Sequence, residues 1–202
     1  MTALERATRA RTAFASVARL MNAVAGWLIV VCAFLIVGDI FGRELIGSSF
    51  GAALELSSYC LAICIAWGLA HAMTERQHVR IDLIVARCPI RLRQYLHIGA
   101  LGAMIAWCAF LTYGAVALVI ESNDFGATDR STLNIPLIIP QGLWAFGIAG
   151  FVTYLSVLFI EVMLAAVAGN PQWVETLLGP RTMDEEAAEA LEAIPQTKLD
   201  DV

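Results

Sequence analysis

The stretch Leu20–Gly38 reads LMNAVAGWLIVVCAFLIVG and contains no charged residue. A helix needs about 20 consecutive apolar residues to cross a bilayer. Further uncharged stretches of this length lie at Leu56–Thr74, Gln94–Ile120 and Ser131–Ile160. None of them alternates apolar and polar residues as the strands of a membrane barrel do. The sequence therefore predicts an all-α integral membrane protein with four transmembrane helices.

The composition supports the same fold class. Hydrophobic residues make up 59% of the 202 residues, and charged residues only 15%. Soluble domains are about 25% charged and about 45–50% apolar. A chain of this size cannot bury such an apolar surplus in one core, so the surplus must face lipid. The first apolar run is longer than that of a signal peptide and lacks a clear cleavage site, so we expect it to be retained.

The basic residues indicate the orientation. Of thirteen, only Arg43 and Arg130 lie in the 39–55 and 121–135 loops. The other eleven precede the first span, follow the fourth, or lie between the second and third. Because cytoplasmic loops carry the excess of arginine and lysine, we expect both termini and the 75–93 loop in the cytoplasm.

The two ends of the chain differ in charge. Residues 181–202 carry seven acidic side chains against Arg181 and Lys198, which accounts for the whole formal net charge of −5. We divide the chain into a basic N-terminus at 1–17, a four-helix membrane domain at 18–168 and an acidic cytoplasmic tail at 169–202. No basic patch indicates nucleic acid as a partner.

The 75–93 loop contains a segment with one apolar face. Its apolar residues recur at the i, i+3, i+4, i+7 spacing of a helical face, and its arginines fall largely on other faces. The apolar positions are Ile81, Ile84, Val85 and Cys88, and the basic ones Arg80, Arg87 and Arg91. We predict an interfacial amphipathic helix over 79–88, either anchored to membrane lipids or docked on another membrane subunit. His78 and Asp82, four residues apart, are expected to bond locally, since two ligands are too few for a metal site.

Charged residues gather at the predicted outer ends of the first two spans: Asp39, Arg43, Glu44 and Glu55. Charges at membrane depth are costly and usually paired, so Arg43 and Glu55 form a candidate pair between helices. The alternative is that all four are hydrated at the interface. Glu161, near the inner end of the fourth span, is expected to snorkel to the aqueous interface.

Cofactor chemistry has few candidate residues. His71 and His97 lie near the inner ends of the second and third spans, where two histidines could hold haem in a redox subunit. A hydrogen-bonded histidine is the simpler interpretation. Cys60 and Cys64 share a helical face and are more typical of packing than of redox chemistry. Nucleotide-binding, nucleophile-elbow and zinc motifs are absent. We therefore expect no cofactor, no metal and no catalysis.

The fourth span is expected to begin near Pro136 or Pro140, because proline suits a first helical turn and disrupts a helix interior. The middles of the spans contain no charged residue that could hold a substrate or an ion. Binding to a partner is therefore expected to come from helix packing. Small residues that would permit close approach are Gly99, Ala100, Gly102 and Ala103.

Several short motifs follow one another along the chain. They are FGREL at 41–45, GSS at 47–49, ALELS at 53–57, RQHVRID at 76–82 with Pro89 after it, STLNIP at 131–136 and PQ at 140–141. In this order, on four predicted spans, they resemble the DctQ-like family, the small membrane subunits of tripartite ATP-independent periplasmic (TRAP) transporters. RQHVRID is similar to the family's H-V-x-V-D signature, and the resemblance covers about residues 18–165.

The resemblance implies a subunit rather than a pump. In such transporters a large, DctM-like membrane subunit carries the substrate and ion sites, and a periplasmic substrate-binding protein captures the solute, often an organic acid. The small subunit scaffolds the large one in the bacterial inner membrane and helps to receive the binding protein during symport. The partner or structural residues expected here are Arg43, Glu55, His78, Asp82 and Pro136. The alternatives are a haem- or quinone-linked redox subunit and a free-standing membrane adaptor.

Overall fold

The structure is a computed structural model that describes residues 3–47, 51–76, 88–131 and 133–179. It contains four long helices, each long and apolar enough to cross a membrane. Their bounds are Ala3–Ile46 (α1), Ala53–Thr74 (α2), Ile90–Asp124 (α4) and Ile138–Val167 (α5). A short helix, α6, follows at Pro171–Leu178. The prediction of an all-α membrane protein with four spans is confirmed. The 79–88 helix falls almost entirely on residues outside the described ranges.

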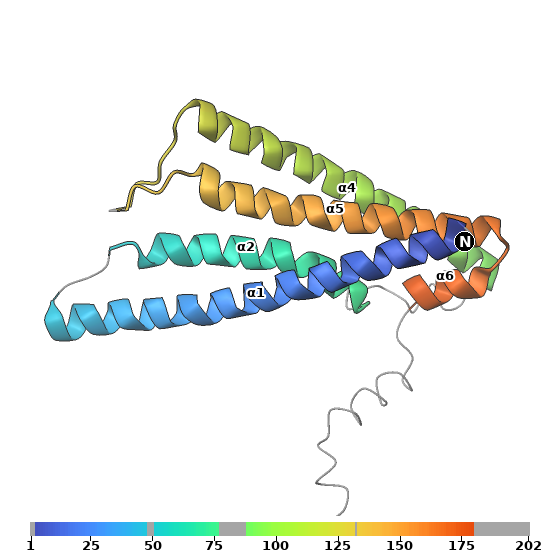
Figure 1. Ribbon diagram of the computed structural model, residues 1–202, viewed down its shortest axis with the longest axis horizontal. Coiled ribbons are helices and arrows are strands. Elements are labelled where there is room, and N and C mark those ends of the chain that lie inside the picture. Colours follow the sequence, from blue (N-terminus) through green and yellow to red (C-terminus); the bar gives the residue numbers. More distant parts are fainter. Residues whose placement is uncertain (1–2, 48–50, 77–87, 132, 180–202) are drawn as a thin grey trace, which may run out of the picture.

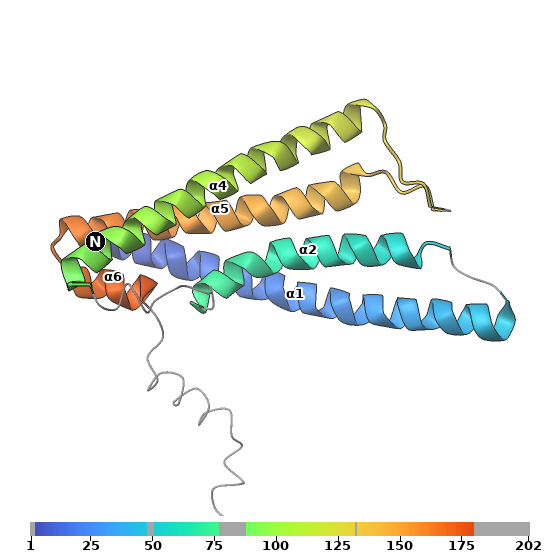
Figure 2. The same ribbon diagram turned by 180° about the vertical axis from the view of Figure 1, so that it is seen from behind.

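The four long helices lie side by side in the order α1, α2, α5, α4 (Figures 1 and 2). The closest packing joins α1 to α2 and α4 to α5, and the α2–α5 contact joins these two pairs. α1 also crosses α5, so that the start of α1 lies beside the end of α5 (Figure 1). We call this the α6 end, because α6 packs there against α4 and α5. The C-terminal ends of α1 and α4 lie at the opposite end (Figure 1).

The contact between α2 and α5 depends on a glycine. A Cβ atom at Gly147 would lie 2.5 Å from Trp67 Cδ1 and 2.9 Å from Ala66 Cβ. Trp67 Nε1 also donates a hydrogen bond of 2.9 Å to the Leu143 carbonyl. The missing side chain therefore lets the two helices approach closely at this point, as small residues do in membrane helix pairs.

The helices extend beyond the apolar runs that predicted them. α1 has 44 residues, although its uncharged run extends only from Leu20 to Gly38. At 1.5 Å per residue such a helix is roughly 66 Å long, about twice the hydrocarbon thickness of a bilayer. Its first turns therefore reach past the membrane core and run along the end of α5. α5 begins at Ile138, between the two prolines at which its start was predicted.

α6 was not predicted from the sequence. It begins after Asn170, whose side chain accepts a hydrogen bond from the Trp173 amide, and Pro171 occupies its first turn. Both features are favourable at a helix start. Val174 and Leu178 are buried in the core cluster formed with α1, α2, α4 and α5. α6 is therefore an integral part of the α6 end.

Candidate functional site: charged groups at the two ends of the helices

Among the described residues, the most deeply buried charged side chain is Glu161 on α5, which is 0% exposed. Arg11 Nε donates to its Oε2 at 2.7 Å, and Thr8 Oγ1 donates to its Oε1 at 2.9 Å. Trp173 Nε1, from α6, lies 3.4 Å from the same Oε1. The prediction that Glu161 snorkels to water is wrong, because donors on α1 and α6 surround the buried carboxylate instead.

Local helix geometry explains this cluster. Thr8 and Arg11 are three residues apart, so they share one face of α1. Tyr154 is buried two turns before Glu161 on the same face of α5, close to the Arg11 side chain. A buried charge is tolerated when it is paired and fully hydrogen-bonded. The cluster fixes the first turns of α1 and the start of α6 onto α5.

A second charged cluster attaches α6 to its other neighbours. Glu175 Oε1 on α6 forms an ion pair of 3.0 Å with Arg93 Nη1 on α4. His97 Nε2 lies 3.9 Å from Glu175 Oε2. Arg76, just after α2, donates a 3.2 Å hydrogen bond to the Thr176 carbonyl. α6 thus contacts the ends of α2, α4 and α5.

The two histidines considered as haem ligands face polar protein groups. His97 is buried beside Glu175, as described above. On α2, Nδ1 of His71 lies 3.2 Å from Thr74 Oγ1, one turn further along. Within the described ranges, no three side chains of the metal-binding types come together.

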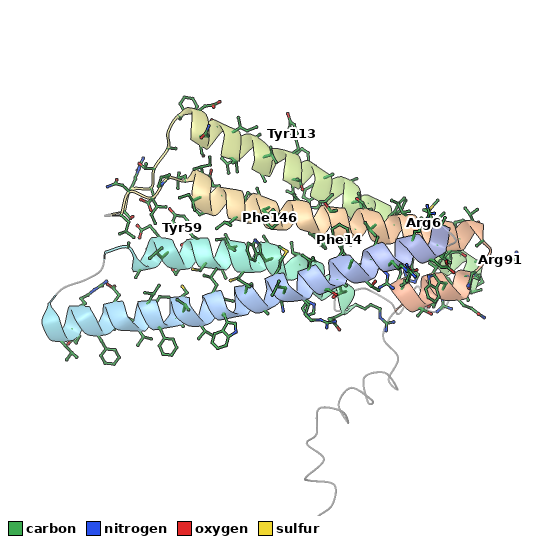
Figure 3. All side chains as sticks on the ribbon, viewed as in Figure 1. Arg6, Phe14, Tyr59, Arg91, Tyr113 and Phe146 are labelled. Atoms are coloured by element: carbon green, nitrogen blue, oxygen red, sulfur yellow. The ribbon has the colours of Figure 1, made fainter. Side chains whose placement is uncertain are left out.

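The loop at the opposite end is organised by Asp129. One carboxylate oxygen, Oδ1, accepts from the amide of Ser131 at 3.2 Å, its hydroxyl at 2.9 Å and the amide of Ile135 at 3.0 Å. The other, Oδ2, lies 3.3 Å from the hydroxyl of Tyr59 on α2. Figure 3 shows Tyr59 near the start of α2. Asp129 is 8% exposed, so the turn is closed around this side chain. It forms a compact, preorganised surface next to the start of α5.

Pro136, one of the expected structural residues, belongs to the same loop. It forms an isolated antiparallel bridge with Thr128, and the Leu137 amide donates to the Ala127 carbonyl at 2.9 Å. Asn134 adopts a positive φ of 47°, which asparagine tolerates better than most residues. The chain is thereby turned back into α5, which begins two residues after Pro136.

The other expected residues are placed only in part. Arg43 Nη2 forms an ion pair of 3.0 Å with Asp39 Oδ2 on the same helix, the Arg43 side chain being 68% exposed and that of Asp39 6%. Glu55 is half-buried in the first turn of α2. The Arg43–Glu55 pair stays a prediction. His78 and Asp82 lie outside the described residues.

Between the two ends, the spans present thiols and small residues rather than charges. Cys64 Sγ on α2 donates to the Ala25 carbonyl on α1 at 3.1 Å, in the seam between these helices. Cys32 and Cys64 are buried there as small packing residues. The uncharged runs of the four spans thus offer apolar surface and helix seams, and the ionisable groups described above lie at their ends.

Three features of the site were not predicted from the sequence, although two of them have a recognisable sequence pattern. Asn170-Pro171 is a typical helix start, and it marked α6. Asp129 two residues before Ser131 is typical of a side-chain-closed turn. No local pattern links Arg11 to Glu161, because the two are 150 residues apart.

A family model described as "Tripartite ATP-independent periplasmic transporters, DctQ component" matches residues 32–165, which is more than half of the chain. This chain belongs to the DctQ family. The resemblance drawn from the motifs between Phe41 and Gln141 is therefore confirmed. The DctQ match begins inside α1 and ends inside α5, so it includes Glu161 and Asp129 but not Arg11 or α6. Searches of curated proteins and of solved structures each gave no match.

Proposed function

We propose that this DctQ chain packs beside a large, DctM-like membrane subunit and helps to receive a periplasmic substrate-binding protein, in the ion-gradient-driven uptake of a small organic acid or similar solute. Membership of the family makes it the small membrane subunit of a TRAP transporter. The large subunit would hold the substrate and ion sites. This chain would scaffold it and catalyse no reaction.

The observation that carries the proposal is the exposure of the spans. Only 11% of the most apolar stretch of α1 and 6% of that of α4 are buried within the chain. Exposed apolar surface at membrane depth must meet lipid or another membrane protein. α4 also exposes Gly99, Ala100 and Ala103, and small residues allow a partner helix to approach closely. The exposed side of α4 is therefore a suitable surface for packing against the large subunit.

We propose that the loop around Asp129 helps to receive the binding protein. In the proposed orientation this loop faces the periplasm, where the binding protein arrives. Its carboxylate-closed turn presents a fixed backbone, so a partner that docks on it need not order it first. Arg130 is exposed beside the buried Asp129 and offers a charge for recognition.

We also propose that the α6 end of the chain faces the cytoplasm. The α6 end holds the described arginines Arg6, Arg11, Arg76 and Arg93, and the distribution of arginine and lysine along the sequence assigns this end to the cytoplasm. Reporter fusions to residue 124 and to the C-terminus test this assignment. We expect periplasmic activity from the fusion at residue 124 and cytoplasmic activity from the one at the C-terminus. Periplasmic activity from the C-terminal fusion would contradict the orientation.

The scaffold role is tested by reconstitution. Vesicles are prepared with the large subunit and the binding protein, with and without this chain, and uptake is measured under an ion gradient. We expect uptake only when the chain is present. Full transport without it would disprove the role. In complete vesicles, alanine substitutions of polar residues within the four spans should leave the ion dependence and the substrate preference unchanged.

A further inference from the structure

A groove runs along the border of α1 and α5, from the middle of the spans to the α6 end. It consists of two cavities of about 270 and 510 Å³ on consecutive turns of the same two helices. At the α6 end its walls are Ala3, Ala7 and Ala10 of α1 with Val157, Ile160 and Leu164 of α5. Figure 3 shows Arg6, Phe14 and Phe146 in succession along this border. From Ala3 to Met21 the groove spans roughly 27 Å of α1, at 1.5 Å per residue.

The groove is apolar along its length and cationic at one end. Arg6 lines it at the α6 end and is exposed. Within the described part of the chain, no acidic side chain forms an ion pair with Arg6. Glu161, which lies on the same stretch of α5, is already occupied by Arg11 and Thr8. The Arg6 guanidinium therefore lies at the α6 end of an apolar groove that leads toward the middle of the spans.

This combination matches the two parts of a phospholipid. Apolar walls suit an acyl chain, and an arginine at headgroup depth attracts an anionic phosphate. Basic pockets between membrane helices on the cytoplasmic side bind anionic headgroups in this way. We propose that the groove binds one anionic phospholipid, with its phosphate on Arg6 and an acyl chain along the α1–α5 border. Its assignment to the cytoplasmic leaflet rests on the orientation in the proposed function, whereas binding itself does not.

Native mass spectrometry of the full chain, titrated with phosphatidylglycerol, tests the headgroup contact. We expect one saturable lipid on the wild-type chain, and weaker retention of phosphatidylcholine. Arg6→Gln should weaken phosphatidylglycerol binding about fivefold, the factor that corresponds to ~1 kcal/mol for one arginine near a membrane surface. Arg6→Lys should restore most of the binding. Arg19→Gln is the matched control, since Arg19 is also exposed on α1 but does not line the groove.

Blocking the groove tests the acyl-chain contact. Ala10 is half-exposed on the groove wall, so Ala10→Phe fills the channel without entering the core. We expect this substitution to reduce retention of phosphatidylglycerol, and unchanged retention would overturn the proposed position. Equal losses in Arg6→Gln and Arg19→Gln, or equal binding of the two lipids, would overturn headgroup recognition. Because the chain is measured alone, none of these results depends on transport.

A photo-crosslinking residue at position 10 distinguishes lipid from a protein occupant. In membranes that contain the assembled transporter, we expect it to capture lipid. Capture of the large subunit would show that a partner helix fills the groove and would overturn the proposal. Such a result would leave the scaffold role intact, because it would place the interface on α1 and α5 instead of α4.

Discussion

Arg11 Nε donates to Glu161 Oε2 across 2.7 Å, which joins the third turn of α1 to a carboxylate 150 residues later. Thr8, Tyr154 and Trp173 surround the same pair. The pair therefore secures the part of α1 that extends past the membrane core. It also lies partly outside the region that identifies the family, since Arg11 precedes residue 32.

Arg11→Ala should destabilise the chain by about 3 kcal/mol, because it leaves the Glu161 carboxylate buried without its cation. The double variant Arg11→Met with Glu161→Leu should lose much less than the sum of the single changes, since it removes both charges together. Thermal unfolding of the purified chain in detergent measures these effects. Arg19→Ala is the exposed control and should be neutral. An Arg11→Ala variant as stable as this control would show that the pair does not hold the helices together.

Asp129→Ala should loosen the outer loop, because three donors from Ser131 and Ile135 lose their shared acceptor. Leaving such donors without a partner costs about 1–3 kcal/mol when they are buried. Hydrogen exchange of the amides between 129 and 137 should accelerate, and binding-protein capture should weaken. Arg130→Ala, one residue away and exposed, should leave the exchange unchanged. Slow exchange in both variants would show that the backbone holds the turn without the carboxylate.

Arg43→Ala and Glu55→Ala should each weaken assembly with the large subunit by about 1–3 kcal/mol, as expected for a charge left in a partly hydrated site. Their combination should be less than additive, as measured by co-purification yield across a denaturant series. Strict additivity would show that the two residues do not interact. A double-mutant cycle on Arg43 and Asp39 serves as the reference. These two residues form an i, i+4 pair and the arginine is exposed, so we expect a coupling energy of only about 0.3–0.5 kcal/mol.

Truncation separates α6 from the tail that follows it. A chain that ends after Gly169 lacks α6 and should melt at a lower temperature, since it loses the burial of Val174 and Leu178 at about 1.5–3 kcal/mol each. A chain that ends after Gly179 keeps α6 and should match the full-length protein, because the acidic tail has little apolar surface to bury. Equal melting temperatures for the two truncations would show that α6 does not stabilise the bundle.

Spin labels placed singly along residues 79–88 test the interfacial helix. We expect accessibility to oxygen and to a water-soluble quencher to alternate with a period of 3.6 residues, with lipid exposure highest at Ile81, Ile84 and Val85. Uniform exposure to the water-soluble quencher would rule the helix out. Labels on α4, at the exposed Tyr113 and Phe110, provide the lipid-exposed reference.

Hydropathy predicted the number and type of the spans, but not where the helices end. Apolar runs mark the part of a helix that lies in hydrocarbon. The first helix continues back to Ala3 because residues 3–19 are rich in alanine and arginine, which are strong helix formers, and contain no glycine or proline. The partner of Glu161 could not be predicted, because a contact across 150 residues has no local pattern. Each side chain taken alone looked like an interfacial charge.

The order of the helices has a consequence for synthesis in the cell. The chain folds as two consecutive hairpins, α1 with α2 and α4 with α5, and each hairpin makes its closest contacts within itself. The first hairpin can therefore insert and form before the ribosome has made the second. The two then join laterally, where Gly147 meets Trp67 and where Arg11 meets Glu161, so a larger residue at position 147 should leave both hairpins inserted but push α2 and α5 apart.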